Sequence, residues 1–285
     1  MLNYFNNKTV LKDVFYNNNR KLQTRIDFWN EFGTNNLNYK DFLFSLIDDK
    51  FDNYADLGCG NAFYSSLFLP YVQKKAYFCD ISEKMLQKAY ENIKKNNFSK
   101  NINYYLLNED VCETSIPSSS CQLITMMHVL HHVDNIYSAL NEAKRIVSPN
   151  GYIIVTTYNH NLKDWLNAIH YKTIEELGFP KYMLDKPAYL KFSGNNAFDI
   201  LKRVFPTVIK KEYINNAIVN DVESVMMYYK SAMMYRLSKG PYTKDIDVCQ
   251  WQKLYEKVKE HVCTKIEKDG VIEVDGKVSA FKIYR

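Results

Sequence analysis

The sequence predicts an α/β fold built on a doubly wound, parallel sheet. Between residues 54 and 158, short apolar runs alternate with segments of helical periodicity, and strands that alternate with helices form parallel sheets. A glycine-rich turn follows the first apolar run, at the edge where such sheets bind ligands. The chain has 285 residues, of which 46% are hydrophobic and 24% charged, so it is long and apolar enough for a large globular domain.

The net charge of +5 indicates an ordinary solvated surface rather than a dedicated nucleic-acid-binding one. The whole basic excess lies after residue 159, because the part before it is balanced. A nucleic-acid-binding protein usually carries a stronger basic cluster. A nucleic-acid partner is therefore not favoured, although it stays open.

The six cysteines form no CxxC pair, and four of them lie in apolar runs or beside glycine. This pattern favours reduced cysteines in a cytoplasmic protein over a disulfide framework or a zinc site. No apolar run approaches the ~18 residues of a membrane span. The first residues also lack the charged and apolar regions of a signal peptide. We expect a cytoplasmic protein with no membrane partner.

Residues 1–50 are predicted to be mostly helical. Apolar residues three and four positions apart indicate two helix faces, and the polar segment 34–38 separates them. The first face contains Leu22, Ile26, Trp29 and Phe32, and the second contains Phe42, Leu43, Leu46 and Ile47.

The alternating region contains five apolar runs that predict strands. These runs are Tyr54–Leu57, Ala76–Cys79, Ile102–Leu107, Cys121–Met126 and Tyr152–Tyr158. A helix near residues 61–69 is expected to end at Pro70. A second helix is expected to open with Ser82 as its N-cap, and a third to begin at Asp134 and end before the turn Pro149-Asn150-Gly151.

Residues 160–285 have a less regular pattern. A helix-rich stretch covers about 160–190, and a short helix ends before Pro206. A strand is predicted at Thr207–Tyr213, and Asp221 is expected to cap a helix. A regular apolar stripe predicts another helix through Trp251, Leu254, Tyr255, Val258 and Val262. The last two apolar runs, Val271–Val274 and Val278–Tyr284, flank an Asp-Gly turn and predict a hairpin.

The segment Asp56-Leu57-Gly58-Cys59-Gly60-Asn61-Ala62 is the main chemical signal. Glycines between a strand and a helix allow backbone N–H groups to approach a ligand at the helix N-terminus. Phe63 occupies the place of the third glycine of a dinucleotide-binding fingerprint, so that fingerprint fails. Asp56 would repel a diphosphate but attract a cationic ligand.

Two further acidic residues follow successive predicted strands. Asp80 comes 20 residues after Gly60 and can accept two hydrogen bonds from the hydroxyls of a ribose. Asp110 is followed by Val111 and can accept a hydrogen bond from the exocyclic amine of adenine. Each of these acids alone is more often a solvated turn residue, but three in series at strand ends indicate a ligand site.

These motifs resemble those of class I S-adenosylmethionine-dependent methyltransferases of the type 11 domain kind. The resemblance runs from about Tyr54 to Tyr158 and is carried by YADLGCGNA, FCDISEKML, LNEDV, LITMMHVLHHV and LNEAKRIVSPNGYIIVTTYN. It implies a Rossmann-like, seven-stranded sheet with an antiparallel C-terminal hairpin strand and helical cap insertions. It also implies S-adenosylmethionine as the cofactor, but it does not identify the methyl acceptor.

The resemblance assigns roles to particular residues. The methionine part of the cofactor is expected against Asp56, Gly58 and Gly60, and against Met127 or His128. The ribose and the adenine face are expected against Asp80 and Ile81, and the adenine edge against Asp110 and Val111. Two positions depart from the family pattern: Ala62 replaces the last glycine of the loop, and Gln122 replaces an acid at the start of the fourth strand.

We expect four parts in the chain. Residues 1–50 form an N-terminal helical lid, and residues 51–160 form the S-adenosylmethionine-binding core. Residues 161–270 form helical acceptor-binding insertions with the sixth strand, and residues 271–285 form the last strand of the core sheet. Arg25 in the lid is a candidate ligand of the cofactor carboxylate, although a plain surface arginine is the other interpretation.

Three histidines, His128, His131 and His132, follow the fourth predicted strand. His128 or His132 is a candidate general base, because imidazole titrates near neutral pH. The alternative is that these side chains pack and cap a strand-to-helix corner. A metal site through His128 and His131 would lack accompanying carboxylate or cysteine ligands, so no metal is predicted.

The acceptor is expected to be a small molecule methylated at N or O, because the added segments suggest a closed pocket. The nine tyrosines between residues 160 and 270 can line that pocket or pack in a core. One alternative is a tRNA or other RNA acceptor, held by basic residues of the second half such as Lys202, Arg203, Lys210 and Lys211. Another is a non-catalytic protein that binds the cofactor or a partner.

Overall fold

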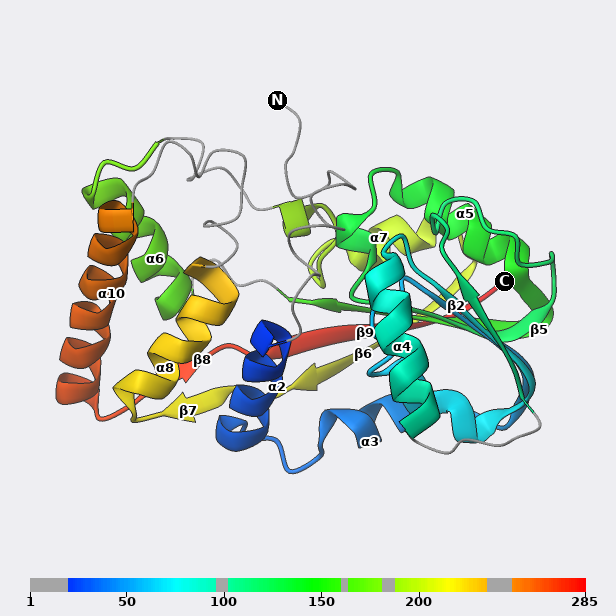
Figure 1. Cartoon of the computed structure of the whole chain (residues 1–285), viewed down its shortest axis with the longest axis horizontal. Coiled ribbons are helices and arrows are strands. Elements are labelled where there is room, and N and C mark those ends of the chain that lie inside the picture. The colour runs from blue at the N-terminus through cyan, green and yellow to red at the C-terminus, as the bar shows by residue number, and fades with distance from the viewer. Residues whose placement is uncertain (1–19, 96–101, 160–163, 181–187, 235–247) are drawn as a thin grey trace.

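The computed structural model describes residues 20–95, 102–159, 164–180, 188–234 and 248–285. Its main element is a seven-stranded sheet in the order β3-β2-β1-β4-β5-β9-β6 (Figure 1). Within this sheet β9 runs antiparallel to both of its neighbours, β5 and β6, and the other neighbouring pairs are parallel. Its strands are β1 (Phe51–Leu57), β2 (Val72–Cys79), β3 (Asn103–Leu107), β4 (Cys121–Met127), β5 (Val147–Tyr158), β6 (Thr207–Ile214) and β9 (Lys277–Tyr284). The predicted α/β fold class, with seven strands, is confirmed.

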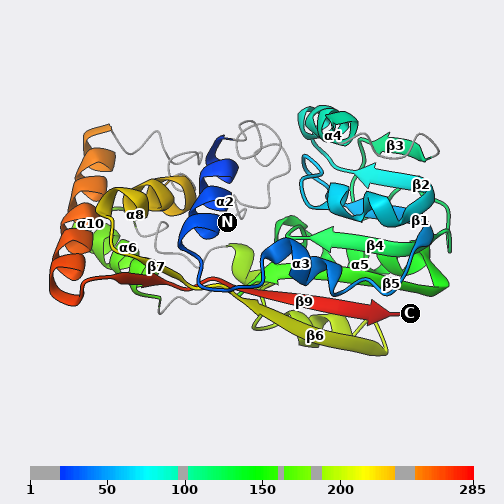
Figure 2. The same ribbon diagram turned by 90° about the horizontal axis from the view of Figure 1, so that it is seen from below.

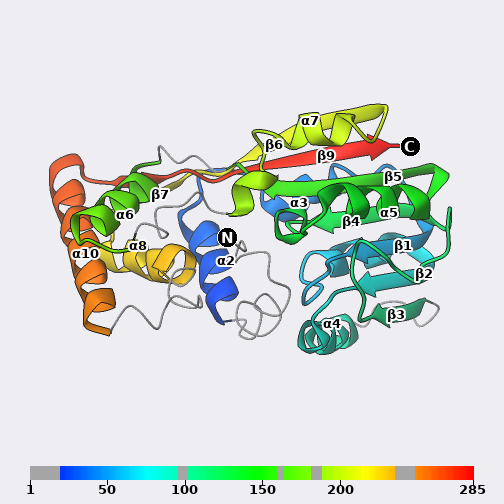
Figure 3. The ribbon, with the colours of Figure 1, turned by 90° about the horizontal axis from the view of Figure 1, so that it is seen from above.

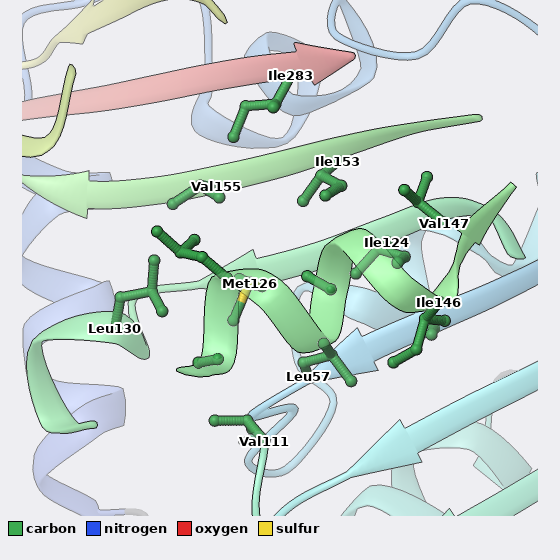
Figure 4. Packing of buried hydrophobic residues seen from close by; sticks show 14 of the residues in the cluster. Leu57, Val111, Ile124, Met126, Leu130, Ile146, Val147, Ile153, Val155 and Ile283 are labelled. Atoms are coloured by element: carbon green, nitrogen blue, oxygen red, sulfur yellow. The ribbon is translucent and has the colours of Figure 1, made fainter. Parts of the chain in front are cut away.

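Helical elements cover both faces of this sheet, as double winding requires. The elements on one face are α5 (Ile136–Ile146), α7 (Ala197–Lys202) and the short 3₁₀ helices η4 (Leu130–His132) and η6 (Ala188–Lys191). The other face is covered by α3 (Tyr39–Phe44), η3 (Ser65–Tyr71) and α4 (Glu83–Lys95). Alternate strand residues point to opposite faces, so each face has its own apolar cluster. Figure 4 shows part of the first cluster, where Leu57, Ile124 and Ile153 from three strands gather near Ile146 of α5.

A second group of elements forms a cap beside the sheet (Figure 2). Its members are α2 (Arg20–Phe32), α6 (Trp165–Glu176), β7 (Ala217–Val219), α8 (Val222–Tyr229) with the π turn η7 (Lys230–Met234), α10 (Val248–Asp269) and β8 (Ile272–Val274). They share a separate apolar cluster that includes Phe28, Leu166, Met226 and Leu254. The first described helix therefore packs with elements from the second half of the chain, whereas α3 packs on the sheet.

The predicted pairing of the last two apolar runs is wrong. β8 pairs with β7, and β9 pairs with β5 and β6, so the Asp275-Gly276 segment does not reverse the chain. Instead, β6-β7 and β8-β9 form one antiparallel ribbon that runs from the sheet into the cap (Figure 3). At the junction, the Asn215 N–H donates to the Gly276 carbonyl over 2.7 Å. A Cβ at position 276 would lie 2.1 Å from the Asn215 carbonyl oxygen, so only glycine allows this close approach.

Local details differ from the sequence expectations at three points. The helix expected near 61–69 is the 3₁₀ helix η3, which contains Pro70. α5 begins two residues later than expected, because Asn135 rather than Asp134 caps it by accepting the Ser138 N–H over 3.1 Å. Ser82 precedes α4, but its buried hydroxyl makes no hydrogen bond, so it is not a side-chain N-cap.

Candidate functional site

The loop after β1 has the backbone conformation that its glycines predict. Gly58 and Gly60 adopt φ values of +80° and +55°, and Ala62 adopts +56°, which is unusual for a residue with a side chain. A Cβ at Gly58 would lie 2.2 Å from the Val129 side chain. At Gly60 the nearest atom to an added Cβ is the Met85 methyl at 3.5 Å, an ordinary van der Waals distance, so the positive φ rather than lack of space favours glycine there.

Asp80 joins this loop to the end of β2. Its carboxylate accepts hydrogen bonds from the Gly60 and Ser82 N–H groups, each over 2.8 Å. Burial raises the pKa of Asp80, and the same two backbone hydrogen bonds oppose that rise. The carboxylate therefore lies against the backbone of Gly60, and its expected contact with a ribose stays a prediction.

Asp56 lies beneath the loop rather than on its surface. Its side chain is 2% exposed and accepts a hydrogen bond from the Thr125 hydroxyl over 2.7 Å. The Tyr54 hydroxyl lies 2.6 Å from the same Thr125 oxygen. Burial raises the pKa of Asp56 to about 6, although the hydroxyls of Ser65 and Thr125 oppose the rise. Its expected contact with a cofactor stays a prediction.

The expected adenine segment lies after β3. Asp110 accepts the Cys112 N–H over 2.9 Å, and Val111 is buried in the core. The loop that follows is held by Glu142 of α5, whose Oε1 accepts from the Thr114 N–H and hydroxyl over 2.8 and 2.7 Å. The other expected cofactor contacts, Ile81 and Met127, lie at the ends of β2 and β4 and are half-buried and buried.

Next to this edge of the sheet, an aromatic cluster surrounds His128. The His128 ring stacks on Tyr158 with centroids 4.2 Å apart, and its Nε2 lies 3.2 Å from the Tyr39 hydroxyl. The Tyr39 ring also contacts Tyr64 and Tyr213, each at a centroid distance of 5.2 Å. These five side chains, Tyr39, Tyr64, His128, Tyr158 and Tyr213, are called the aromatic cluster below.

His128 has three properties typical of a functional residue. Its φ of +54° lies in the left-handed region, which non-glycine residues adopt rarely and often at active sites. Burial lowers the pKa of its imidazole to about 3, so the ring is uncharged at neutral pH. Its Nδ1 is buried without a hydrogen-bond partner, and so is the hydroxyl of nearby Thr156.

His131 and His132 lie apart from this geometry, in the short helix η4. Their rings contact each other at 4.0 Å, and His131 is buried. The structure therefore brings His128 into the aromatic cluster, whereas His132 stays a candidate on sequence grounds alone.

Arg25 lies in the cap, where its Nη1 donates to the Ser231 carbonyl over 2.8 Å. Its positive charge also lowers the pKa of Tyr64 in the aromatic cluster, although burial raises that pKa more. The Arg25 charge therefore acts on the aromatic cluster, and its expected contact with the cofactor carboxylate stays a prediction.

Several tyrosines from the second half of the chain pack in the apolar cluster of the cap. Tyr229 is buried and its hydroxyl lies 2.9 Å from His170 Nδ1, and Tyr228 stacks on Phe28 at 4.3 Å. Packing is therefore their role in the structure, while Tyr235 lies outside the described residues.

Sequence reasoning missed Tyr39, Tyr64 and Tyr158, because it looked for acceptor-binding tyrosines only after residue 160. The signal for two of them was available. Tyr158 ends a predicted strand, and Tyr64 follows the glycine loop by four residues, so both had to lie at the ligand-binding edge. Tyr39 had no such signal, since its position depends on how α3 crosses the sheet.

Part of the sequence is similar to known proteins. Residues 55–155 match the sequence model of a family described as "Methyltransferase domain". An uncharacterized protein of Haemophilus influenzae is 30% identical over 154 residues, which are 52% of this chain and 58% of that protein. A ubiquinone biosynthesis O-methyltransferase of Thiobacillus denitrificans is 27% identical over 114 residues, 40% of this chain and 47% of that protein. The chain thus spans about half the length of the curated relatives it matches.

Among solved structures, the YcgJ protein of Bacillus subtilis has a similar fold. Its TM-score is 0.54 at 13% identity, over 86% of this chain and 97% of that one. The match of residues 55–155 to a methyltransferase domain and the shared fold agree with the resemblance that the motifs predicted. In the described part of the chain, no helix has both the length and the apolar character to span a membrane.

Proposed function

We propose that the protein transfers the methyl group of S-adenosylmethionine to a nitrogen or oxygen atom of a small-molecule acceptor. The observation that carries the proposal is the aromatic cluster beside the glycine loop, with an uncharged His128 at hydrogen-bonding distance from Tyr39. The match to a methyltransferase domain over residues 55–155 supports the methyl donor.

The residues present fit the cofactor. The positive φ values of Gly58 and Gly60 give the loop the turned backbone proposed to face the methionine part, and the Asp80 carboxylate beside it suits ribose hydroxyls. We assign Asp56, Gly58, Met127 and His128 to the methionine side, Ile81, Asp110 and Val111 to adenine, and Arg25 to the cofactor carboxylate. When bound, S-adenosylmethionine supplies an activated methyl group on a sulfonium cation.

His128 is the proposed catalytic residue. A neutral imidazole does not repel a sulfonium cation, and it can accept a hydrogen bond from a hydroxyl or an amine and so orient the attacking atom. Taking the proton itself requires the pKa of His128 to rise from about 3 once the acceptor is bound. Its unpartnered Nδ1 and the Thr156 hydroxyl offer two buried polar groups to an acceptor. His132 stays a second candidate for the base. Most of the catalysis is expected from positioning and exclusion of water.

We propose the same four parts for the chain: a lid at 1–50, the cofactor core at 51–160, acceptor-binding segments at 161–270 and the last strand at 271–285. Within the last part, only β9 belongs to the core sheet, because β8 pairs with β7 in the cap. Support comes from α2, which packs on α8 in the cap, and from Arg25, whose charge reaches Tyr64. None of the six cysteines, all of which lie in the described residues, is in a disulfide, and the cytoplasm stays the proposed location, in line with the pattern of reduced cysteines.

An RNA acceptor is the alternative function. The basic side chains proposed to hold phosphates have partners within the chain: Lys210 pairs with Glu212 at 2.9 Å, and Lys211 donates to the Ser45 carbonyl over 3.3 Å. Lys202 and Arg203 donate to the Pro206 carbonyl and the Tyr137 hydroxyl. These contacts favour the small-molecule proposal.

The first test is ligand binding followed by methyl transfer. At ~100 times its dissociation constant, a ligand stabilises the folded state by ~2.7 kcal/mol, which raises the melting temperature by about 5–10 °C for a chain of this size. We expect that shift with S-adenosylmethionine and S-adenosylhomocysteine but not with NAD. A shift with NAD alone would contradict the proposal.

The second test uses labelled S-adenosylmethionine and fractionated cell extract. We expect label in small molecules. Label in RNA would support the alternative, and cofactor binding without any transfer would support a non-catalytic binding protein.

A further inference from the structure

The segment that carries Tyr39 lies across the sheet and is tied to the last strands by polar contacts. This segment, residues 37–48, is called the strap and contains α3 (Figure 2). At its start, the Tyr213 hydroxyl donates to the Leu37 carbonyl over 2.9 Å. At its end, the Asp48 carboxylate pairs with Lys282 of β9, and the Asp48 N–H donates to the Tyr152 hydroxyl over 3.2 Å.

Lys282 has an unusual environment for a lysine. Its side chain is 9% exposed, and its Nζ lies 4.4 Å from the Tyr152 ring centroid and 5.8 Å from that of Tyr284. A buried ammonium group needs a counter-charge, and aromatic faces add a weaker attraction. Asp48 supplies the counter-charge, so the position of the strap end depends on Lys282.

Between its two ends, the strap buries Phe42, Leu43 and Leu46 against the sheet. Apolar contacts are not directional, so they hold the strap down without fixing where it lies along the sheet. The polar ties at its two ends supply that direction, together with the hydrogen bond from Lys211 Nζ to the Ser45 carbonyl over 3.3 Å. Tyr39 lies two residues from one tie, and its hydroxyl reaches Nε2 of His128 at 3.2 Å.

We propose that Lys282 is a positioning residue: through Asp48 it fixes the strap so that the Tyr39 hydroxyl meets His128. Lys282 lies on β9 and is not a member of the aromatic cluster that contains Tyr39 and His128. Its effect on that pair therefore passes through the strap. This inference rests on the proposed function for its catalytic meaning, but the geometry it predicts can be measured without any methyl transfer.

The test compares Lys282→Met and Asp48→Asn with Lys74→Met. Lys74 also pairs with an aspartate, Asp52 at 2.7 Å, but that pair is exposed and lies on β1 and β2. The readout is the NMR shift of the His128 ring nitrogens, assigned by its loss in His128→Asn. The Tyr39→Phe variant gives the reference chemical shift of a His128 ring that lacks the contact with the Tyr39 hydroxyl.

We expect Lys282→Met and Asp48→Asn to move the His128 signal toward its position in Tyr39→Phe, while Lys74→Met leaves it unchanged. Lys282→Arg should restore most of the original shift. Binding of S-adenosylhomocysteine should change less than about twofold, and once an acceptor is known, kcat should fall about tenfold with little change in the cofactor affinity.

Asp48 is 59% exposed, so Asp48→Asn decides the question even where Lys282→Met does not fold. An unchanged His128 signal in Asp48→Asn would overturn the inference. Failure of the unaltered protein to bind S-adenosylhomocysteine would instead overturn the proposed function, so the two failures are distinguishable.

Discussion

The Tyr39 hydroxyl lies 3.2 Å from Nε2 of His128, although 89 residues separate them in the chain. Burial raises the pKa of Tyr39 and lowers that of His128, so both groups are uncharged at neutral pH. The pair lies beside the loop that contains Gly58 and Gly60. Proton transfer between these two groups is therefore unfavourable, and the contact instead holds the His128 ring in one orientation, which suits the positioning of an acceptor.

Tyr39→Phe removes the hydroxyl and keeps the ring. We expect kcat to fall about 100-fold, since general acid–base groups contribute at least that much when the acceptor arrives protonated. The ring contacts with Phe42 and Tyr213 remain, so the melting temperature should change little. Steady-state kinetics and titration calorimetry check this, with Tyr105→Phe as a control on the remote strand β3. Unchanged kcat would remove Tyr39 from the mechanism.

Asp80→Ala should weaken binding of S-adenosylhomocysteine by about 10- to 100-fold, because charge-assisted hydrogen bonds of ~1.5–3 kcal/mol are lost. The Gly60 and Ser82 N–H groups also lose their acceptor, so part of the effect comes from a looser loop. Asp52→Ala, which removes an exposed acid on β1, is the matched control for titration calorimetry. Equal affinity in both variants would mean that the ribose is held elsewhere.

His128 should make the free energy of unfolding depend on pH. Its pKa is lowered from 6.5 to about 3 in the folded state, so its contribution is complete above pH 6.5 and is lost as the pH falls. At pH 5 the loss is about 2 kcal/mol. Asn tolerates a positive φ, so His128→Asn should fold and lack this loss. Denaturant titrations at pH 7.5 and 5 measure the difference, and equal losses in both proteins would show that His128 is not buried.

The fold and the cofactor loop were predictable because they depend on local patterns. Alternating apolar runs define the strands, and acids such as Asp80 directly follow them. The cap was only partly predictable, because α2 packs with α8 and η7, about 190 residues or more later in the chain. The predicted hairpin between β8 and β9 was wrong because the Asp-Gly pair does not specify one structure. It is compatible with a hairpin turn and also with the close approach of Gly276 to Asn215.

Asp56 should give the opposite pH dependence. Its pKa is raised to about 6 from 3.8, so the unfolded chain releases the proton first, and stability declines as the pH rises from about 4 to about 6. The full decline is about 3 kcal/mol. Asp56→Asn cannot titrate, so its stability relative to the unaltered protein should increase by that amount between pH 3.5 and 7.5. A difference in unfolding free energy between the two proteins that does not change with pH would contradict the raised pKa of Asp56. The contribution of His128 cancels in this difference, because both proteins contain it.

Salt dependence separates the two acceptor classes. If Lys202, Arg203, Lys210 and Lys211 neutralised four phosphates of a single strand, the affinity would fall about 50-fold between ~50 and ~200 mM salt, at ~0.7 log units per phosphate and tenfold of salt. The structure gives all four side chains intramolecular partners, and a small acceptor held by the aromatic cluster depends on pocket shape instead. We therefore expect kcat/KM to change less than about tenfold over that range. We also expect the double change of Lys202 and Arg203 to Ala to leave turnover nearly unchanged, because neither residue contacts the strap. A steep salt dependence, together with loss of methyl transfer in that variant and competition by bulk tRNA, would replace the small-molecule proposal with the RNA one.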